Sequence, residues 1–358
     1  MQKILSLFIS TIILTSINLY ADDNFKLYGS ARLSTFYTDE SDSPAKRDRT
    51  NTVWELQNNS RVGGIIENDL LKGGFEIGNN FGDVEFRKLY GEKKISDKIN
   101  LLIGIDYTPL NYFPSNQVGL IYNYKGGFQG DTGLKPYGGI YNGYNAMIQL
   151  STDRLKIALI EPATIDAANL KLGVTGEIDK VAPKVELAYH IGSDTQYVDF
   201  YSGYQAYKII EDITIREYDI NSYVFGLNYG LNLGPVIITG NAYSGQNIAT
   251  YGLWAEGDDS PRIIANEIYD CTTDGYILVL GFRTSPKTIL ETGVGYIAHS
   301  VDGAVADDET LSVYLNLQYQ LKSFHFVPEL GIVDSMTDNA ENDEGKKLYI
   351  GAKWQINF

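Results

Sequence analysis

The chain has 358 residues, of which 29 are lysine or arginine, 45 are aspartate or glutamate and one, Cys271, is cysteine. Its formal net charge of −16 argues against a nucleic-acid binder, because such proteins need basic faces for the phosphate backbone. A single cysteine also rules out an intramolecular disulfide framework.

The N-terminus has the pattern of a secretory signal peptide. Lys3 supplies a positive charge, residues 4–17 are mostly apolar, and Ala21 is a small residue before two aspartates. A membrane anchor is the alternative, but the apolar run is shorter than the roughly 20 residues that a spanning helix needs. We therefore expect residues 1–21 to be a cleaved signal peptide and residues 22–358 to form a single domain.

Apolar and polar residues alternate along almost the whole mature sequence. Near the start, Phe25 and Leu27 alternate with Lys26 and Tyr28, and the same period recurs as far as the C-terminus. Successive side chains of a strand point to opposite faces, so each such segment has one apolar and one polar face. No segment of comparable length has a helical period, so the sequence predicts an all-β fold.

The predicted connections alternate in length. Short turns fall at 68–72, 96–98, 179–183, 232–235, 285–287 and 322–323, and longer polar segments at 39–50, 108–136, 193–218, 248–273, 301–308 and 336–344. Tight turns on one rim and long loops on the other are typical of outer-membrane barrels, whereas a β-sandwich has no such alternation. The prediction is a transmembrane antiparallel up-and-down β-barrel of about 16 strands.

We place these strands from the alternation and from the turns. The stretch 193–218 could hide a further hairpin. The expected strands are 25–38, 51–67, 71–79, 84–95, 98–107, 140–151, 154–162, 170–179, 183–192, 219–231, 235–247, 274–284, 288–300, 309–321, 324–335 and 345–358.

Three segments taken together resemble the general porins of Gram-negative bacteria. Residues 25–29 (FKLYG) resemble their opening strand, and 59–64 (NSRVGG) with Glu67 and Leu70 resemble their second strand. Residues 104–110 (GIDYTPL) resemble the strand end that leads into their constriction loop. The terminal KWQINF, ending at Phe358, looks like the signal that the barrel-assembly machinery reads.

This resemblance implies an outer-membrane porin in contact with lipid and lipopolysaccharide. It implies a homotrimer of barrels, each with its third loop folded inward, and a water-filled channel for passive diffusion of ions and small hydrophilic solutes. No cofactor or metal is expected. A substrate-specific channel for sugars, phosphate or organic acids is one alternative, and a plugged structural or adhesive barrel is another.

The resemblance also implies a constriction with a basic wall facing acidic residues. On matching positions Arg32, Arg61 and Arg87 form the basic wall, with Lys26 nearby. A charge on the lipid face costs roughly 2–4 kcal/mol near the midplane, so these arginines should point inward. The alternative is that they are ordinary lumen charges balanced by glutamates. The expected pore-lining residues are Lys26, Arg32, Arg61, Arg87, Glu55, Glu85, Asp106, Asn111, Ser115 and Asn116.

The candidate third loop, residues 109–120, contains no carboxylate. Asp106 precedes it and Asp131 lies well after it, so the acidic half of the constriction is missing from the expected place. Unopposed arginines would favour anions, whereas the acidic net charge would draw cations to the mouth. The sign of selectivity therefore stays open at the level of sequence.

Motifs for enzymatic chemistry are absent from the sequence. It contains no Gly-x-Ser-x-Gly, no phosphate-binding loop and no Cys-x-x-Cys, and its three histidines, His190, His299 and His325, fall on separate predicted strands. We expect a non-enzymatic protein, with a Ser/His/Asp site inside the barrel as the alternative. Acidic clusters such as Asp258–Asp259 leave calcium binding in the loops open.

Overall fold

A computed structural model describes residues 25–42, 49–80, 83–119, 121–122, 128–163, 176–180, 182–212 and 215–358. The predicted signal peptide lies outside the described residues. None of the described residues belongs to a helix with the length and apolar character that a membrane crossing requires.

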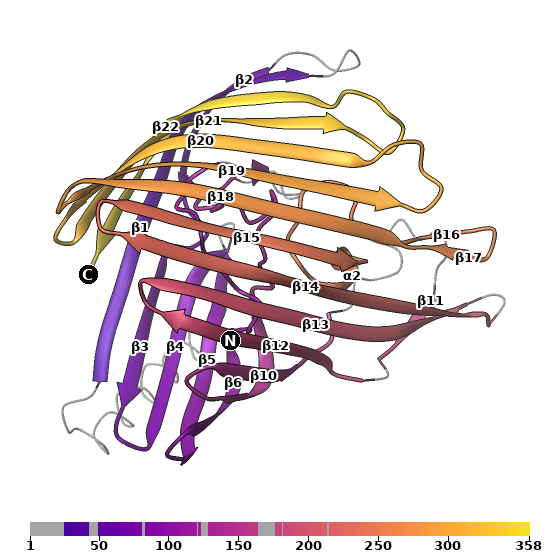
Figure 1. The fold of residues 1–358 in the computed structure, drawn as a ribbon, viewed down its shortest axis with the longest axis horizontal. Helices are drawn as coiled ribbons and strands as arrows, with labels where there is room; N and C mark the ends of the chain where they lie inside the picture. Colours follow the sequence, from indigo (N-terminus) through magenta and orange to yellow (C-terminus); the bar gives the residue numbers. More distant parts are fainter. Residues whose placement is uncertain are drawn as a thin grey trace, which may run out of the picture.

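The chain folds into a closed antiparallel barrel (Figure 1). The barrel closes because β1 (Phe25–Asp42) pairs on one side with β22 (Gly345–Asn357) and on the other with β2 (Arg49–Leu56) and β3 (Arg61–Glu67). Phe358 extends this seam, since its backbone N–H and C=O exchange hydrogen bonds of 3.0 and 2.7 Å with Gly29.

Eighteen named strands form the main sheet. Because β2 and β3 are halves of one strand, as are β11 and β12, the barrel has sixteen strands, as the sequence predicted. Two short hairpins, β7–β8 and β16–β17, lie outside the main sheet. The other elements are β4 (Leu71–Asn80), β5 (Asp83–Ser96), β6 (Ile99–Tyr107), β7 (Ile121–Tyr122), β8 (Phe128–Gln129), β9 (Tyr144–Ser151), β10 (Leu155–Ile160), β11 (Gly176–Asp179), β12 (Lys184–Ser193), β13 (Gln196–Glu211), β14 (Glu217–Leu233), β15 (Val236–Gln246), α2 (Ile248–Tyr251), β16 (Arg262–Ile264), β17 (Glu267–Tyr269), β18 (Cys271–Ser285), β19 (Thr288–Val301), β20 (Asp308–Leu321) and β21 (Phe324–Thr337).

Two predicted connections are wrong, and the two errors cancel in the strand count. Residues 179–183 are not a turn, because β11 and β12 both pair antiparallel with β13 and therefore run in the same direction. Residues 193–218 are not a loop, because they contain β13 and the start of β14. The alternation in β13 is obscured because Tyr201 and Tyr207 are buried on its inner face while Tyr204 is exposed on its outer face.

The predicted strand 51–67 is interrupted at residues 57–60. There the backbone N–H of Gln57 and the hydroxyl of Ser60 both donate to the carbonyl of Arg32, at 2.8 and 3.1 Å. The Ser60 hydroxyl also accepts from the Arg32 N–H at 3.0 Å. A side chain therefore replaces part of the strand ladder, and the interruption lies directly beside Arg32.

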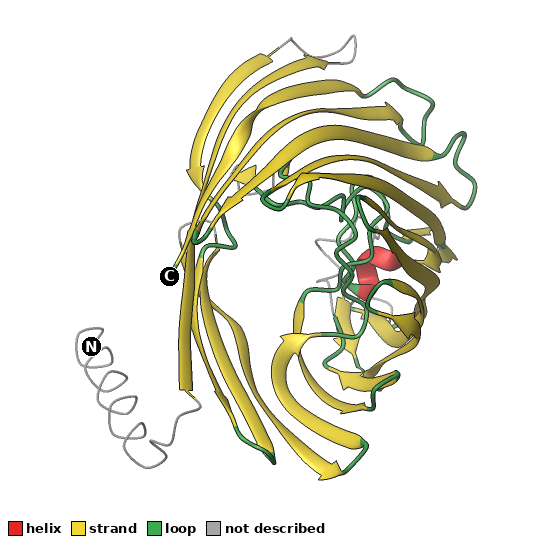
Figure 2. Ribbon diagram, turned by 60° about the vertical axis from the view of Figure 1, so that its left-hand side comes forward, coloured by secondary structure: helices red, strands yellow, loops and turns green. Residues whose placement is uncertain are grey.

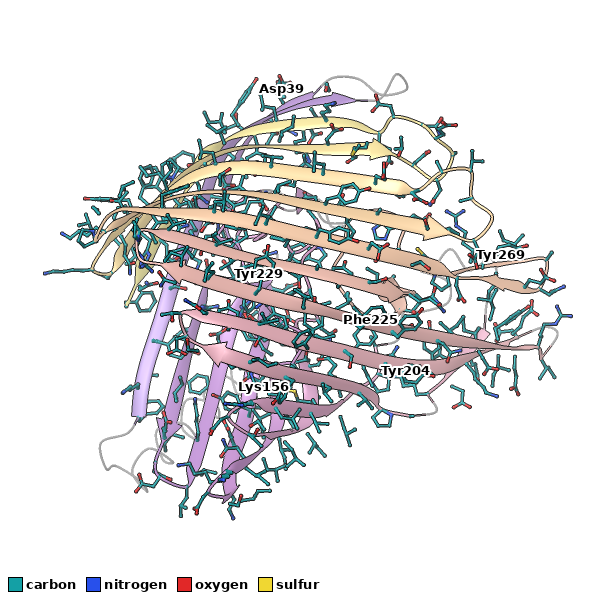
Figure 3. All side chains as sticks on the ribbon, viewed as in Figure 1. Asp39, Lys156, Tyr204, Phe225, Tyr229 and Tyr269 are labelled. Atoms are coloured by element: carbon teal, nitrogen blue, oxygen red, sulfur yellow. The ribbon has the colours of Figure 1, made fainter. Side chains whose placement is uncertain are left out.

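The outer face of the barrel is apolar and its inner face is polar. Exposed outward side chains recur around the barrel, among them Leu27, Ile103, Leu159, Phe225, Leu278 and Ile350. Figure 3 labels Phe225 on β14 together with the exposed Tyr204 on β13. The buried inner residues include Ser34, Glu76, Gln149, Gln205, Asn241, Ser312 and Asn316. This distribution is the one expected of a barrel with lipid outside and polar groups inside.

Two long connections fold into the barrel, where Figure 2 shows loops running across its interior. The segment between β6 and β9, described at residues 108–119, 121–122 and 128–143, reaches the wall strands β15 to β22 through hydrogen bonds such as Asn241 Nδ2 to the Gly138 carbonyl, 2.8 Å. Gly138 (φ 97°) permits this approach, because a Cβ there would meet backbone atoms of Tyr276 and Tyr296. The second connection, 247–270, contains α2 and packs beside the first, as the Glu256 N–H donates to the Pro136 carbonyl, 3.0 Å.

Candidate pore constriction

A buried carboxylate on β4 holds two of the three predicted arginines. The Glu76 side chain lies 3.3 Å from Nε of Arg61 and 2.7 Å from Nε of Arg87. The Tyr28 hydroxyl donates to the same carboxylate at 2.9 Å. Because these residues come from β1, β3, β4 and β5, adjacent strands fix both guanidinium groups on the inner wall.

Asp131 supplies the carboxylate that the predicted third loop lacked. It lies in the inward segment, 2.8 Å from Nη1 of Arg32 on β1 and 2.8 Å from Nζ of Lys353 on β22, and accepts from Asn59 at 2.9 Å. Burial alone would raise the pKa of Asp131, but Lys353 and Arg32 outweigh that effect and hold it below its ordinary value of 3.8. The acidic half of the site exists, but it sits later in the loop than expected.

Lys135 stands over three aromatic rings. Its Nζ donates to the backbone carbonyl of Asp131 at 3.1 Å and lies 5.3, 4.7 and 5.9 Å from the ring centroids of Phe113, Tyr141 and Trp254. Within the described ranges, no carboxylate oxygen lies within 4.0 Å of it. Loss of hydration lowers the pKa of Lys135 from 10.5 to about 8, although Asp131 acts in the opposite direction.

These residues border a cavity of about 350 Å³, which we call the narrow cavity. Five cationic side chains line it, with Asp131 as the lining carboxylate and Glu76 behind two of the arginines. The lining residues are Arg32, Asn58, Asn59, Arg61, Arg87, Tyr107, Phe113, Ser115, Asn116, Gln117, Gly130, Asp131, Gly133, Lys135, Tyr141, Lys353 and Gln355.

A second cavity of about 650 Å³, the wide cavity, lies on the side of the short turns. Tyr107 and Phe113 line both cavities, and their rings meet edge to face with centroids 5.3 Å apart. The charged groups of the wide cavity include Lys88 with Asp106 (2.7 Å) and His190 with Asp199 (2.6 Å).

Carboxylates of the opposite wall hold the inward segment by its backbone. Glu291 accepts from the N–H and the Nδ2 of Asn116, both at 2.8 Å, and Glu329 accepts from the N–H groups of Val118 and Gly119, both at 2.7 Å. On β12, Glu186 accepts from the Leu110 N–H at 3.0 Å. The segment is thus fixed at three points of the wall.

A third cavity, of about 730 Å³, lies where the long connections meet. Its lining includes Glu256, Asp258, Asp259, Asp308, Asp338 and Glu344, with Arg262 paired to Asp258 at 2.6 Å. In the part of the chain that the structure describes, no group of three or more His, Cys, Asp or Glu side chains is placed to hold a metal ion.

Five of the ten predicted pore residues, Arg32, Arg61, Arg87, Ser115 and Asn116, meet at the narrow cavity, while Asp106 and Asn111 line the wide one. The other three predicted pore residues line neither cavity. Glu55 and Glu85 are exposed, and Lys26 is exposed six residues before Arg32 on the same strand, roughly 20 Å away.

Sequence reasoning missed Asp131, Lys135 and Lys88 as site residues. Asp131 and Lys135 lie within the predicted long segment 108–136, so the length of that segment was the available signal. Lys353, which the sequence analysis did not single out either, pairs with Asp131 from the last strand. Lys88 could not be predicted as a lumen residue, because strict alternation puts it on the face opposite to Arg87.

No protein-family model matches the chain. No curated protein matches it either. Solved structures do match in fold: the outer membrane channel DcaP of Acinetobacter baumannii has a TM-score of 0.66 and 14% identity, covering 93% of this chain and 97% of that one. The anion-selective porin of Comamonas acidovorans has a TM-score of 0.58 and 12% identity (93% and 99% covered). OmpF of Salmonella typhi, in complex with daunomycin, has a TM-score of 0.57 and 10% identity, covering 94% of this chain and 99% of that one. The chain therefore has the fold of the Gram-negative outer-membrane porins.

Proposed function

We propose that this chain, which has the fold of the outer-membrane porins, is a channel in the outer membrane for passive diffusion of ions and small hydrophilic solutes. The observation that carries the proposal is the inward segment 108–143, which is fixed to three wall carboxylates and borders a charged cavity. Such a segment narrows a polar lumen without adding catalytic groups.

The surface of the barrel and the matching structures support a location in the outer membrane. The apolar outward face suits lipid, and matching structures are described as outer membrane proteins, one of them in a trimer form. We propose a homotrimer in contact with lipopolysaccharide, inserted by the barrel-assembly machinery through the strand that ends at Phe358. A trimer-sized band on an unheated SDS gel that shifts on heating supports this, and a monomer-sized band in both lanes contradicts the trimer.

The charges of the narrow cavity favour anions. Five lysines and arginines line it against Asp131 and Glu76, which leaves an excess of three positive charges at the constriction although the whole chain is acidic. Charges at a narrowing act on the permeating ion at close range, whereas charges in exposed loops are screened within about 8 Å at physiological salt. The related fold of the anion-selective porin of Comamonas acidovorans is consistent with this sign.

The test is single-channel recording of the purified protein in a planar bilayer with a salt gradient. A stable conductance with an anion-selective reversal potential is expected. Arg61→Ala should move the reversal potential toward cations, because Glu76 then neutralises Arg87 alone. Absence of conductance would contradict the channel proposal and favour a plugged barrel. Saturable block of the ion current by one solute would favour the substrate-specific alternative.

A further inference from the structure

The strand that carries Arg87 contains a β-bulge at that residue. Glu76 of β4 is paired with Lys88 of β5, but the next residue, Ile77, is paired with Phe86, so Arg87 has no partner of its own. A bulge inserts one extra residue into a strand and redirects the side chains around it.

The bulge places two successive cations on the inner side of the barrel. Val84 and Phe86 before it are 81% and 58% exposed on the outer face, and Leu89 after it is 55% exposed on the same face. Between them Arg87 contacts Glu76 and Lys88 contacts Asp106, both inside the barrel. Without the extra residue, one of two adjacent cations would face lipid, at a cost of roughly 2–4 kcal/mol.

The two cations belong to different cavities. Arg87 lines the narrow cavity and Lys88 lines the wide one. Between these cavities stand Tyr107 and Phe113, and the Lys88 Nζ lies 4.5 Å from the Tyr107 ring centroid. Adjacent Cα atoms are about 3.8 Å apart, so one short piece of backbone places a cation in each of the two cavities, on either side of the Tyr107–Phe113 boundary.

We propose that the bulged pair Arg87–Lys88 is the point at which an anionic solute passes from the narrow to the wide cavity, and that Lys88 is a selectivity-determining residue there. This inference rests on the proposed channel function. Asp106 offsets part of the Lys88 charge, so the balance between these two side chains sets how strongly the passage from the narrow to the wide cavity favours anions.

The experiment compares two variants that break the same ion pair. Lys88→Gln removes a positive charge and should lower the anion-to-cation permeability ratio roughly three- to fivefold, the effect of one unit charge at about 10 Å in a partly screened lumen. Asp106→Asn removes the opposing charge and should raise the ratio. A purely structural ion pair would give changes of the same sign in both variants.

Two controls complete the test. Lys88→Arg keeps the charge and should retain the wild-type ratio, and Lys26→Gln removes a lumen-side cation that lines neither cavity and should leave the ratio unchanged. If the wild type is anion-selective and Lys88→Gln matches it, or if Lys26→Gln lowers the ratio equally, the role of Lys88 is refuted while the channel function stands. A wild type without conductance refutes both.

Discussion

The two sides of the barrel interior use charge in opposite ways. On β1 to β5, Arg32, Arg61 and Arg87 line a cavity, and their carboxylates leave positive charge in excess. On β12, β19 and β21, Glu186, Glu291 and Glu329 are buried, and their oxygens accept hydrogen bonds from the backbone of the inward segment. The first side presents its charges to a solute, whereas the second uses them to hold a loop.

This difference explains how an acidic chain can have a narrow cavity whose charged lining side chains are mainly cationic. Glu186, Glu291 and Glu329 do not line the narrow cavity, and their oxygens are bound by N–H groups of the inward segment. The arginines do line the cavity, so their charges lie closer to its contents than those three carboxylates do. The local charge at the narrow cavity is therefore set by which side chains line it, and the net charge of the chain does not report it.

The largest effect is expected from removing a loop anchor on the second side. Glu329→Ala leaves the N–H groups of Val118 and Gly119 without their acceptor. Each buried unsatisfied donor costs about 1–3 kcal/mol, so we expect a loss of roughly 2–6 kcal/mol together with noisier, larger single-channel currents. Thermal unfolding in detergent and bilayer recordings measure both. Glu329→Gln keeps one acceptor, so its stability and current noise should lie between those of the wild type and Glu329→Ala. If Glu329→Ala gives a current as quiet as that of the wild type, the segment is held by other contacts.

An intermediate effect is expected from Asp131→Asn on the first side. Asparagine tolerates the left-handed backbone at this position (φ 55°), so the segment should keep its path. Arg32 and Lys353 lose their shared counter-charge, and the anion preference should rise by about 1 kcal/mol, or about fivefold in permeability ratio. Reversal potentials measure the change. Glu55→Gln, an equal charge change outside both cavities, is the matched control, and an equal rise there would contradict a local effect.

The smallest effect is a pH dependence centred on Lys135. Its pKa of about 8 lies below the ordinary value of 10.5, so the ammonium loses its proton as pH rises through 8. The narrow cavity then loses one positive charge, so the anion preference should decline between pH 7 and 9. Lys135→Met should remove this step. An unchanged step in that variant would assign the titration to another group.

The barrel could be predicted from the sequence, since alternation and turn chemistry are local properties, whereas the strand number came out right because two errors cancelled. Errors arose where the residues on the inner face of a strand are not polar. In β13, Tyr201 lies on the inner face but packs against the inward connections instead of facing water. The inward direction of the arginines could also be predicted, because a charged side chain on the lipid face of a membrane barrel is destabilising.

The remaining half of the site could not be predicted from local patterns. Which glutamates are buried depends on where the inward segment lies: Glu291 meets Asn116 across 175 residues, and nothing local distinguishes it from the exposed Glu55. Lys88 depends on a single extra residue in one strand, which reverses the face assigned by counting. The first is set by a long-range contact and the second by the register between two consecutive strands.

The closing seam has a consequence for the order of assembly. Arg32 lies on the first strand and Lys353 on the last, and Asp131 bridges them across the seam at which β1 and β22 pair. Contacts between residues so far apart in sequence form late, because the chain between them must first be ordered. An unclosed barrel thus lacks both the seam and the Asp131 bridge, so the lining of the narrow cavity is completed only when the last strand pairs with the first.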